Sequence, residues 1–154
     1  MLKTREIQSH DLDVITAHRR SMFEDMGADP ATLDAMARSF ASWLAPRLAD
    51  GRYFGYLVQQ EESIIAGIGM MLLDWPPHTL HPESSQRGYI FNLYVEPEYR
   101  GRGIAADLTR LAEAWLQARG INYAILHASP KARPLYQKLG WAPTSEMAKT
   151  LANS

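Results

Sequence analysis

Residues 94–105, with the sequence YVEPEYRGRGIA, decide the fold of this chain. An aromatic and β-branched strand stops at Pro97, the chain then crosses a turn of alternating arginine and glycine, and an amphipathic helix begins at Ile104. The first backbone N–H groups of a helix have no acceptor within it, and the helix dipole places partial positive charge beside them. The junction therefore predicts an anion-binding site at the start of the helix.

The composition of the turn makes a phosphate or pyrophosphate the expected anion. Gly101 and Gly103 let the backbone come close to a bulky ligand, because no Cβ stands in the way. Arg100 and Arg102 add full positive charges. A glycine-rich turn that merely joins strand to helix is the structural alternative, and the interleaved arginines favour the binding site.

The overall composition limits the class of protein. A length of 154 residues suits a single domain over 1–154, and the 46% hydrophobic and 21% charged residues are ordinary for a soluble globular protein. A net charge of −1 gives no reason to expect nucleic acid or an anionic membrane as partner. The absence of cysteine excludes thiol nucleophiles, disulfides and zinc–thiolate sites. Without a signal-peptide pattern or an apolar run of membrane-spanning length, we expect a cytoplasmic protein.

Hydrophobic periodicity and end signals predict alternating helices and strands. The expected strands cover residues 2–8, 52–60, 64–73, 87–95, 121–127 and 141–151, the last interrupted near Pro143. The expected helices run from a cap at Ser9 or Asp11 to Gly27, from Asp29-Pro30 to Gly51, over 104–120 and over 132–139. Residues 74–86 are expected to form a long irregular loop, a kind of segment that is often functional.

The order of these elements, β-α-α-β-β-β-α-β-α-β, predicts an α/β fold. Consecutive antiparallel strands precede one β-α-β crossover, so we expect a mixed, mostly antiparallel central sheet with helices on both faces. A doubly wound parallel fold is excluded, because strand and helix would then alternate throughout.

Two other phosphate-binding motifs fit the turn less well. A phosphate-binding loop of nucleotide triphosphatases needs lysine and then serine or threonine after its last glycine, where this chain has Ile104 and Ala105. A dinucleotide fingerprint G-x-G-x-x-A matches residues 101–106, but the next strand ends in LHAS, without the acidic residue that binds the ribose.

Two motifs in register resemble those of the GCN5-related N-acetyltransferase (GNAT) superfamily. Arg100-x-x-Gly103-x-Ala105 after a strand is similar to its coenzyme A-binding motif, and residues 132–141, ARPLYQKLGW, resemble its second signature. The resemblance covers nearly the whole chain. It implies the acyl-CoA N-acyltransferase fold, acetyl-CoA as cofactor, and direct acetyl transfer to an amine without an acyl-enzyme.

The resemblance also implies the residues that bind the cofactor. The backbone of Leu93, Tyr94 and Val95 would contact the pantetheine arm and the acetyl carbonyl, with the Val95 N–H as oxyanion donor. The pyrophosphate would lie on the backbone amides of Arg100, Gly101, Arg102, Gly103, Ile104 and Ala105. Lys131 and Arg133 would meet the 3′-phosphate and adenine end, a solvated basic surface being the alternative. Ser129 stands where the family often has asparagine, so its hydroxyl would replace an amide.

By the same resemblance, Tyr136 is the general acid for the departing thiolate. A phenol near its ordinary pKa of about 10 is protonated at neutral pH. A tyrosine packed in the short helix with its hydroxyl bonded elsewhere is the structural alternative. For the base we expect Glu96, which follows the cofactor-contacting strand, and a water chain is the alternative. Glu98 fits a solvated strand end.

The acceptor is expected to bind between the first two helices and the long loop. Phe23 and Met26 are predicted apolar walls, Trp75 on the loop is another, and Asn92 belongs to a polar row with Tyr94 and Glu96. No metal site is expected, because the histidines supply no closed ligand set.

The sequence therefore predicts an acetyl-CoA-dependent N-acetyltransferase that acts on a primary amine of a small molecule or peptide. A non-catalytic acyl-CoA-binding sensor domain is the main alternative. A nucleotide-binding oxidoreductase and an interaction module without a ligand are further alternatives. Neither nucleic acid nor a membrane is an expected partner, and a homodimer is expected because many relatives pair.

Overall fold

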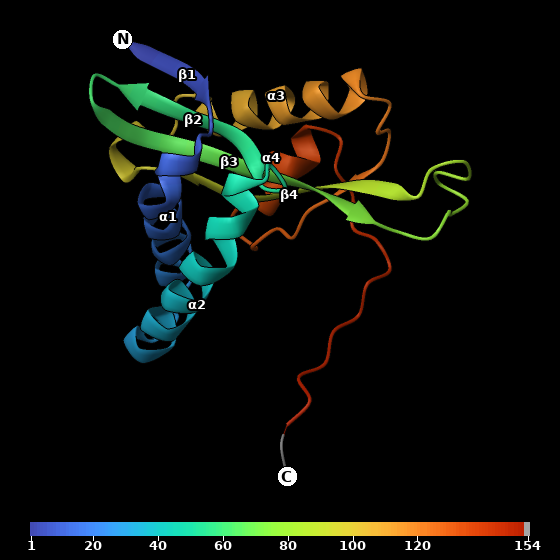
Figure 1. Cartoon of the computed structure of the whole chain (residues 1–154), viewed down its shortest axis with the longest axis horizontal. Coiled ribbons are helices and arrows are strands. Elements are labelled where there is room, and N and C mark those ends of the chain that lie inside the picture. The colour runs from blue at the N-terminus through green and yellow to red at the C-terminus, as the bar shows by residue number, and fades with distance from the viewer. Residues whose placement is uncertain (153–154) are drawn as a thin grey trace.

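The computed structural model describes residues 1–152, which are arranged around a central β-sheet (Figure 1). Within that range the sheet has five strands in the order β1-β2-β3-β4-β5. Their bounds are β1 Leu2–Glu6, β2 Phe54–Gln60, β3 Ser63–Asp74, β4 Gln86–Val95 and β5 Ala124–Ile125. The first four strands pair antiparallel with their neighbours, and β5 joins β4 in parallel. The predicted mixed, mostly antiparallel sheet is confirmed; of the predicted domain, residues 153 and 154 lie outside the described range.

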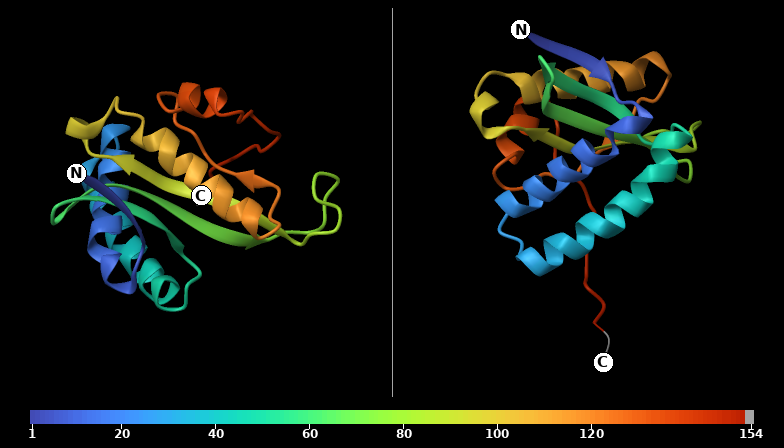
Figure 2. Two further views of the ribbon diagram at one scale, coloured as in Figure 1. Left: turned by 90° about the horizontal axis from the view of Figure 1, so that it is seen from above. Right: turned by 60° about the vertical axis from the view of Figure 1, so that its left-hand side comes forward.

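Helices cover both faces of this sheet, as predicted. Helices α1 (Leu12–Asp25) and α2 (Pro30–Ala49) lie against one face, and α3 (Ile104–Ala118) lies against the other (Figures 1 and 2). The short α4 (Arg133–Lys138) follows β5, and the 3-10 turns η1 (Ser9–Asp11) and η2 (Pro97–Tyr99) precede α1 and α3. No helix among the described residues is long and apolar enough to cross a bilayer.

The start signals identified in the sequence act where the helices begin. Asp29 caps α2 by accepting a hydrogen bond from the backbone N–H of Thr32 at 3.1 Å, and Pro30 occupies the first helical position. Gly27 separates α1 from α2 with a φ of +89°, a conformation that glycine adopts without steric cost.

Two hydrophobic clusters hold the layers together. On the α3 face, Leu108, Ala112 and Leu116 belong to one cluster with Met70 and Ile90 of the sheet. The second cluster, on the face of α1 and α2, joins helix residues to the sheet through Ile15, Phe40, Leu44, Tyr53 and Leu57. Both faces of the sheet are therefore covered by helices that bury apolar side chains.

A bulge in β4 turns the end of this strand. Gly69 of β3 pairs with Phe91, and Gly67 pairs with Tyr94, so two residues of β4 stand opposite the single residue Ile68. The bulged residue Asn92 has a φ of +56°, which few non-glycine residues adopt. Because a bulge bends its strand and increases the local twist, the last residues of β4 take a new direction.

Strand β5 is much shorter than predicted. Only Ala124 and Ile125 form it, and they pair with Gly88 and Tyr89, before the bulge of β4. Beyond that point, no strand of the described residues pairs with the β5 side of β4. The two strands therefore separate and leave one edge of β4 open.

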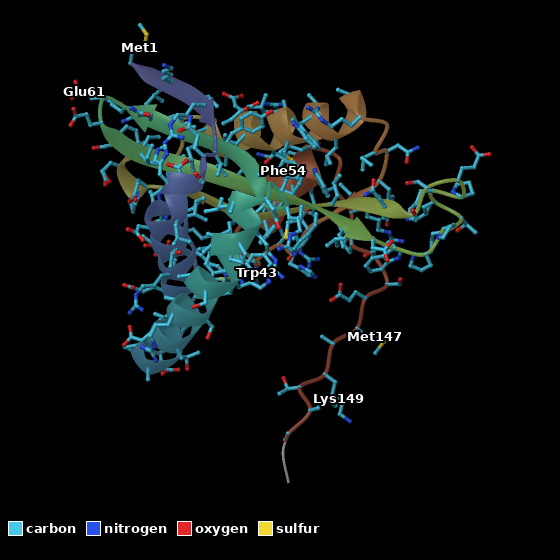
Figure 3. The ribbon with its side chains drawn as sticks, in the orientation of Figure 1. Met1, Trp43, Phe54, Glu61, Met147 and Lys149 are labelled. Carbon is cyan, nitrogen blue, oxygen red and sulfur yellow. The ribbon has the colours of Figure 1, made fainter. Side chains whose placement is uncertain are left out.

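The predicted last strand over 141–151 is wrong. Residues 142–152 lie outside any strand and run away from the sheet on the side of α1 and α2 (Figure 1). The side chain of Met147 is 94% exposed and Leu151 is 81% exposed, and Figure 3 shows Met147 and Lys149 projecting from the tail. Pro143 has no N–H to donate, and β5 is too short to offer this segment a paired edge.

The predicted loop is irregular over residues 75–85, whereas Asp74 and Gln86, which were expected to belong to it, pair with each other at the ends of β3 and β4. A buried hydrogen bond holds this loop in place. Arg87 Nε donates to His81 Nε2 at 2.9 Å, and His81 is buried. The guanidinium of Arg87 lies over the rings of Trp75 and Tyr123 at 4.2 and 4.6 Å from their centroids. Trp75 and Arg87 therefore lie together at the loop end of the β3–β4 hairpin, away from the end that contains Val95.

Candidate active site

The backbone amides at the start of α3 form the most distinct binding feature of the molecule. Among the described residues, the N–H groups of residues 101–106 have no hydrogen-bond acceptor, and no side chain caps the helix. Amides without acceptors at a helix N-terminus attract anions through their own polarity and the helix dipole. The predicted anion site is therefore built from backbone groups, but the expected N–H of Arg100 is not one of them, because it donates to the carbonyl oxygen of Pro97 at 3.3 Å.

Gly101 and Gly103 give the turn its shape. Their φ angles are +78° and +82°, in the left-handed region where an L side chain is strained. A Cβ at either position would point into open space, since no atom lies within 4 Å. The glycines therefore keep a free approach to the amides from outside.

The side chains of Arg100 and Arg102 are used within the protein. Arg100 Nε donates to the carbonyl oxygen of Val95 at 2.8 Å, and its Nη2 donates to Asp25 at 2.9 Å. Arg102 Nη2 donates to the carbonyl oxygen of Glu98 at 3.2 Å. These contacts stiffen the turn and hold it to α1, while the positive charges stay next to the amides.

Val95 directs its N–H group towards the open edge of β4. The N–H of Glu96 donates to the carbonyl oxygen of Ile65 on β3 at 2.8 Å. Because successive N–H groups of a strand point to opposite edges, the N–H of Val95 points away from β3, to the edge where β5 no longer pairs with β4. Arg100 reaches the Val95 carbonyl from that same side. The Val95 N–H is therefore available to a ligand that lies along the open edge.

Tyr136 is buried in the short α4, and its phenol stays protonated. Burial raises the pKa of Tyr136 to about 12, so the hydroxyl keeps its proton at neutral pH. No described residue forms a hydrogen bond with this hydroxyl, and the ring meets Trp141 edge-on at 6.4 Å between centroids. A hydroxyl bonded elsewhere in the protein, the structural alternative, does not occur among the described residues.

Glu96 lies beside a buried histidine of α1. Its carboxylate Oε1 is 3.7 Å from His18 Nε2. Burial lowers the pKa of His18 to about 4, so the ring is neutral at neutral pH and this contact is not an ion pair there. Burial, together with the charge of Glu98, raises the pKa of Glu96. A carboxylate with a raised pKa is better matched to accepting a proton near neutrality.

The match to a known protein family shows to which family the chain belongs. A sequence model of the acetyltransferase (GNAT) family matches residues 13–141. The chain belongs to the GNAT family. Acetyl-CoA is the acetyl donor of this family.

Solved structures and curated relatives agree with this assignment. A GCN5-related N-acetyltransferase from Ralstonia eutropha JMP134 is 46% identical, with a TM-score of 0.96 over 99% of this chain and 100% of that one. A predicted acetyltransferase with acetyl-CoA from Clostridium acetobutylicum is 26% identical, with a TM-score of 0.89 over 98% of this chain and 96% of that one. Human N-acetyltransferase 8B is 31% identical over 94 residues, 59% of this chain, and the match spans only 39% of that relative.

The remaining residues expected to bind the cofactor of this GNAT protein lie on the surface near α4. Ser129 accepts a hydrogen bond from the N–H of Ala132 at 3.2 Å, so its oxygen begins the turn into α4. Lys131 and Arg133 are exposed and form no ion pair with any described residue. Their charges are free to meet an anionic ligand.

The residues predicted to bind the acceptor do not all lie together. Asn92 is buried against α1, and Phe23 lies near it, since both contact Arg19. Met26 is 51% exposed beyond the end of α1. Trp75 packs on Arg87 at the loop end of the hairpin, so the long loop does not bring it to the other three.

Residues 1–152 contain no group of three or more metal-ligating side chains.

The polar row of β4 agrees with its predicted alternation. Asn92 contacts Arg19 and Tyr94 packs on His18, which also approaches Glu96, so Asn92 and Tyr94 of β4 and Glu96 just after it face α1. Leu93 and Val95 belong to the cluster on the opposite face.

Two side chains of α1, His18 and Arg19, were not assigned a role from the sequence. Leu12, Ile15 and Met22 follow one apolar stripe of this helix, which continues in sequence to Met26 just past its end, and position 19 completes the helical spacing. An arginine within an apolar stripe is the signal that would have identified this residue.

Proposed function

We propose that this chain transfers the acetyl group of acetyl-CoA directly to a primary amine of a small molecule or peptide. One observation supports the proposal most strongly. Within the described part of the chain, the backbone amides at the start of α3 have no hydrogen-bond acceptor, and next to them the Val95 N–H points outward from the unpaired edge of β4. Family membership supports it as well. The domain that does this is proposed to be the whole of 1–154.

The proposed binding site for acetyl-CoA combines the amides at the start of α3 with the open edge of β4. The amides of residues 101–105 would hold its pyrophosphate, and Leu93, Tyr94 and Val95 would accompany the pantetheine arm along the open edge. Lys131, Arg133 and Ser129 are proposed to bind its other end. Acetyl-CoA, when bound, supplies the acetyl group as a reactive thioester.

Three groups of the chain would each have one role in the transfer. The Val95 N–H donates a hydrogen bond to the carbonyl oxygen as negative charge develops there. Tyr136 gives its proton to the departing sulfur, and its raised pKa ensures that the proton is present. Glu96 removes the proton from the attacking amine, directly or through water.

Turnover measurements with Tyr136→Phe test this assignment. We expect kcat to fall about 100-fold, since one positioned acid contributes on the order of 100- to 10,000-fold. Stabilisation by acetyl-CoA, measured by thermal shift, should persist in the variant. If the wild type binds acetyl-CoA tightly but acetylates no amine in a broad panel, the non-catalytic sensor is the better assignment.

A homodimer is the proposed assembly. The exposed apolar side chains of Met147 and Leu151 on the tail support it, because protruding apolar groups favour burial against another surface. Light scattering of the wild type and of a variant with Met147→Lys and Leu151→Lys tests this: the wild type should be dimeric and the variant monomeric. Cytoplasmic location stays a prediction from the sequence.

A further inference from the structure

Arg19 is a charged side chain that the protein surrounds with neutral groups. Its Nη1 donates to Asn92 Oδ1 at 2.7 Å, and its guanidinium lies 5.0 Å from the ring centroid of Phe23 and 4.8 Å from that of Phe40. Asn92 in turn donates through Nδ2 to the hydroxyl of Tyr53 at 3.0 Å. The guanidinium is therefore held in one orientation by an amide and two aromatic faces.

The charge of Arg19 has no counter-ion among the described residues. No carboxylate forms an ion pair with it, whereas the neighbouring Arg20 is paired with Asp34 at 2.6 Å. Its Nε is buried without a hydrogen-bond partner and is out of a ligand's reach, which leaves the Nη groups as the donors open to a ligand. A guanidinium offers five N–H donors, and a desolvated donor without a partner costs free energy. The site thus lacks an anion that a ligand can supply.

The location of Arg19 places this unmet charge beside the proposed acetyl-transfer site. Its hydrogen-bond partner Asn92 is the bulged residue of β4, and Val95 lies three positions further along. At about 3.3 Å per strand residue, that separation is at most roughly 10 Å. Arg19 also faces the strand from the side of α1, the same side as Glu96.

We propose that Arg19 binds a carboxylate of the acceptor, so that the natural substrate is an amine that also carries a carboxylate. This inference rests on the proposed function. The separation along β4 favours an amine joined to its carboxylate through several atoms, as in an ω-amino acid or a short peptide. The planar guanidinium suits a carboxylate, which accepts two parallel hydrogen bonds, and Phe23 provides an apolar wall for the connecting atoms.

Paired acceptors test the proposal on the wild-type protein. The probes are γ-aminobutyrate, ε-aminocaproate and glycylglycine. Each is compared, in steady-state assays with acetyl-CoA, with the same compound in which a neutral carboxamide replaces the carboxylate. We expect kcat/KM to be about 10- to 100-fold higher for the carboxylates, the range for hydrogen bonds to a charged group. Equal kcat/KM values for acid and amide, or acetylation of the amides alone, would overturn the proposal.

Arg19→Gln and the control Arg20→Gln locate the effect. In the first variant we expect the preference for carboxylates to vanish through a higher KM, while kcat and the KM for acetyl-CoA stay near wild type. Arg20→Gln should keep the preference. A preference that survives Arg19→Gln, or disappears equally in both variants, contradicts the assignment. If Arg19→Gln does not fold, Arg19→Lys, which keeps the charge but loses the planar fork, should reduce the preference.

Failure of the inference and failure of the proposed function look different. Acetylation of amines without any carboxylate preference removes only the role of Arg19. If acetyl-CoA neither stabilises the protein nor donates acetyl to any probe, the proposed function itself is wrong.

Discussion

The two halves of β4 differ sharply although they belong to one strand. Before the bulge, residues 86–91 pair with β3 on one edge, and Gly88 and Tyr89 pair with β5 on the other. After it, residues 92–95 keep β3 but have no strand partner on the β5 side among the described residues. The first half is scaffold, whereas the second half offers free backbone groups and a polar row to a ligand. One bulged residue, Asn92, separates the two roles.

The largest effect on ligand binding is expected where the open half of β4 meets α3. In Gly103→Asp, a carboxylate would stand against the bound pyrophosphate, and like charges placed together cost several kcal/mol. We expect the affinity for acetyl-CoA, measured by calorimetry, to fall at least about 100-fold, which corresponds to about 2.8 kcal/mol.

Gly120→Asp is the matched control for this variant. Gly120 follows the C-terminal end of α3 with a φ of +74°, so the substitution imposes the same backbone strain away from the proposed site. Its affinity for acetyl-CoA should equal that of the wild type. A similar loss in both variants would mean that strain, rather than the anion site, weakens binding.

The bulge itself can be broken at Asn92. A β-branched valine resists the φ of +56° and removes the hydrogen bonds to Arg19 and Tyr53, so Asn92→Val should lower the free energy of unfolding by about 3 kcal/mol. Asn92→Gly keeps the backbone conformation and loses only the side-chain bonds, which predicts a loss of about 1 to 2 kcal/mol. Urea unfolding measures both; equal losses would show that the backbone conformation costs nothing.

The smallest effect concerns the proton acceptor at the end of β4. Glu96→Gln should lower kcat/KM about tenfold, less than a full base contribution because water can take over. Only the deprotonated carboxylate accepts a proton, so wild-type kcat/KM should fall as pH drops through the raised pKa of Glu96.

This acid limb should disappear in Glu96→Gln. In Glu98→Gln the limb should move to lower pH, because the charge of Glu98 helps to raise the pKa of Glu96. An identical pH profile in all three proteins would exclude Glu96 as the base.

Local signals in the sequence predicted most of the fold and the anion site. Asp29-Pro30 marked the start of α2, and residues 100–105 identified the turn before α3, because capping and glycine conformations act over a few residues. The short β5 and the unpaired tail were not predictable in this way, since strand formation depends on a partner that is distant in the sequence.

The acceptor side was the least predictable part of the site. Trp75 was expected beside Phe23, yet its partner Arg87 fixes it at the other end of the hairpin, a contact that no local pattern reveals. Arg19 stood in an apolar stripe, but its lack of a counter-ion emerges only when β4, α1 and α2 are packed together.

A crystal structure of the protein with coenzyme A tests most directly whether the open half of β4 and the start of α3 form one binding site. We expect pyrophosphate oxygens within hydrogen-bond distance of the amides of residues 101–105, and the pantetheine arm along residues 93–95 with its sulfur end near the Val95 N–H. Coenzyme A bound elsewhere, with those amides unoccupied or covered by the protein's own side chains, would contradict this expectation.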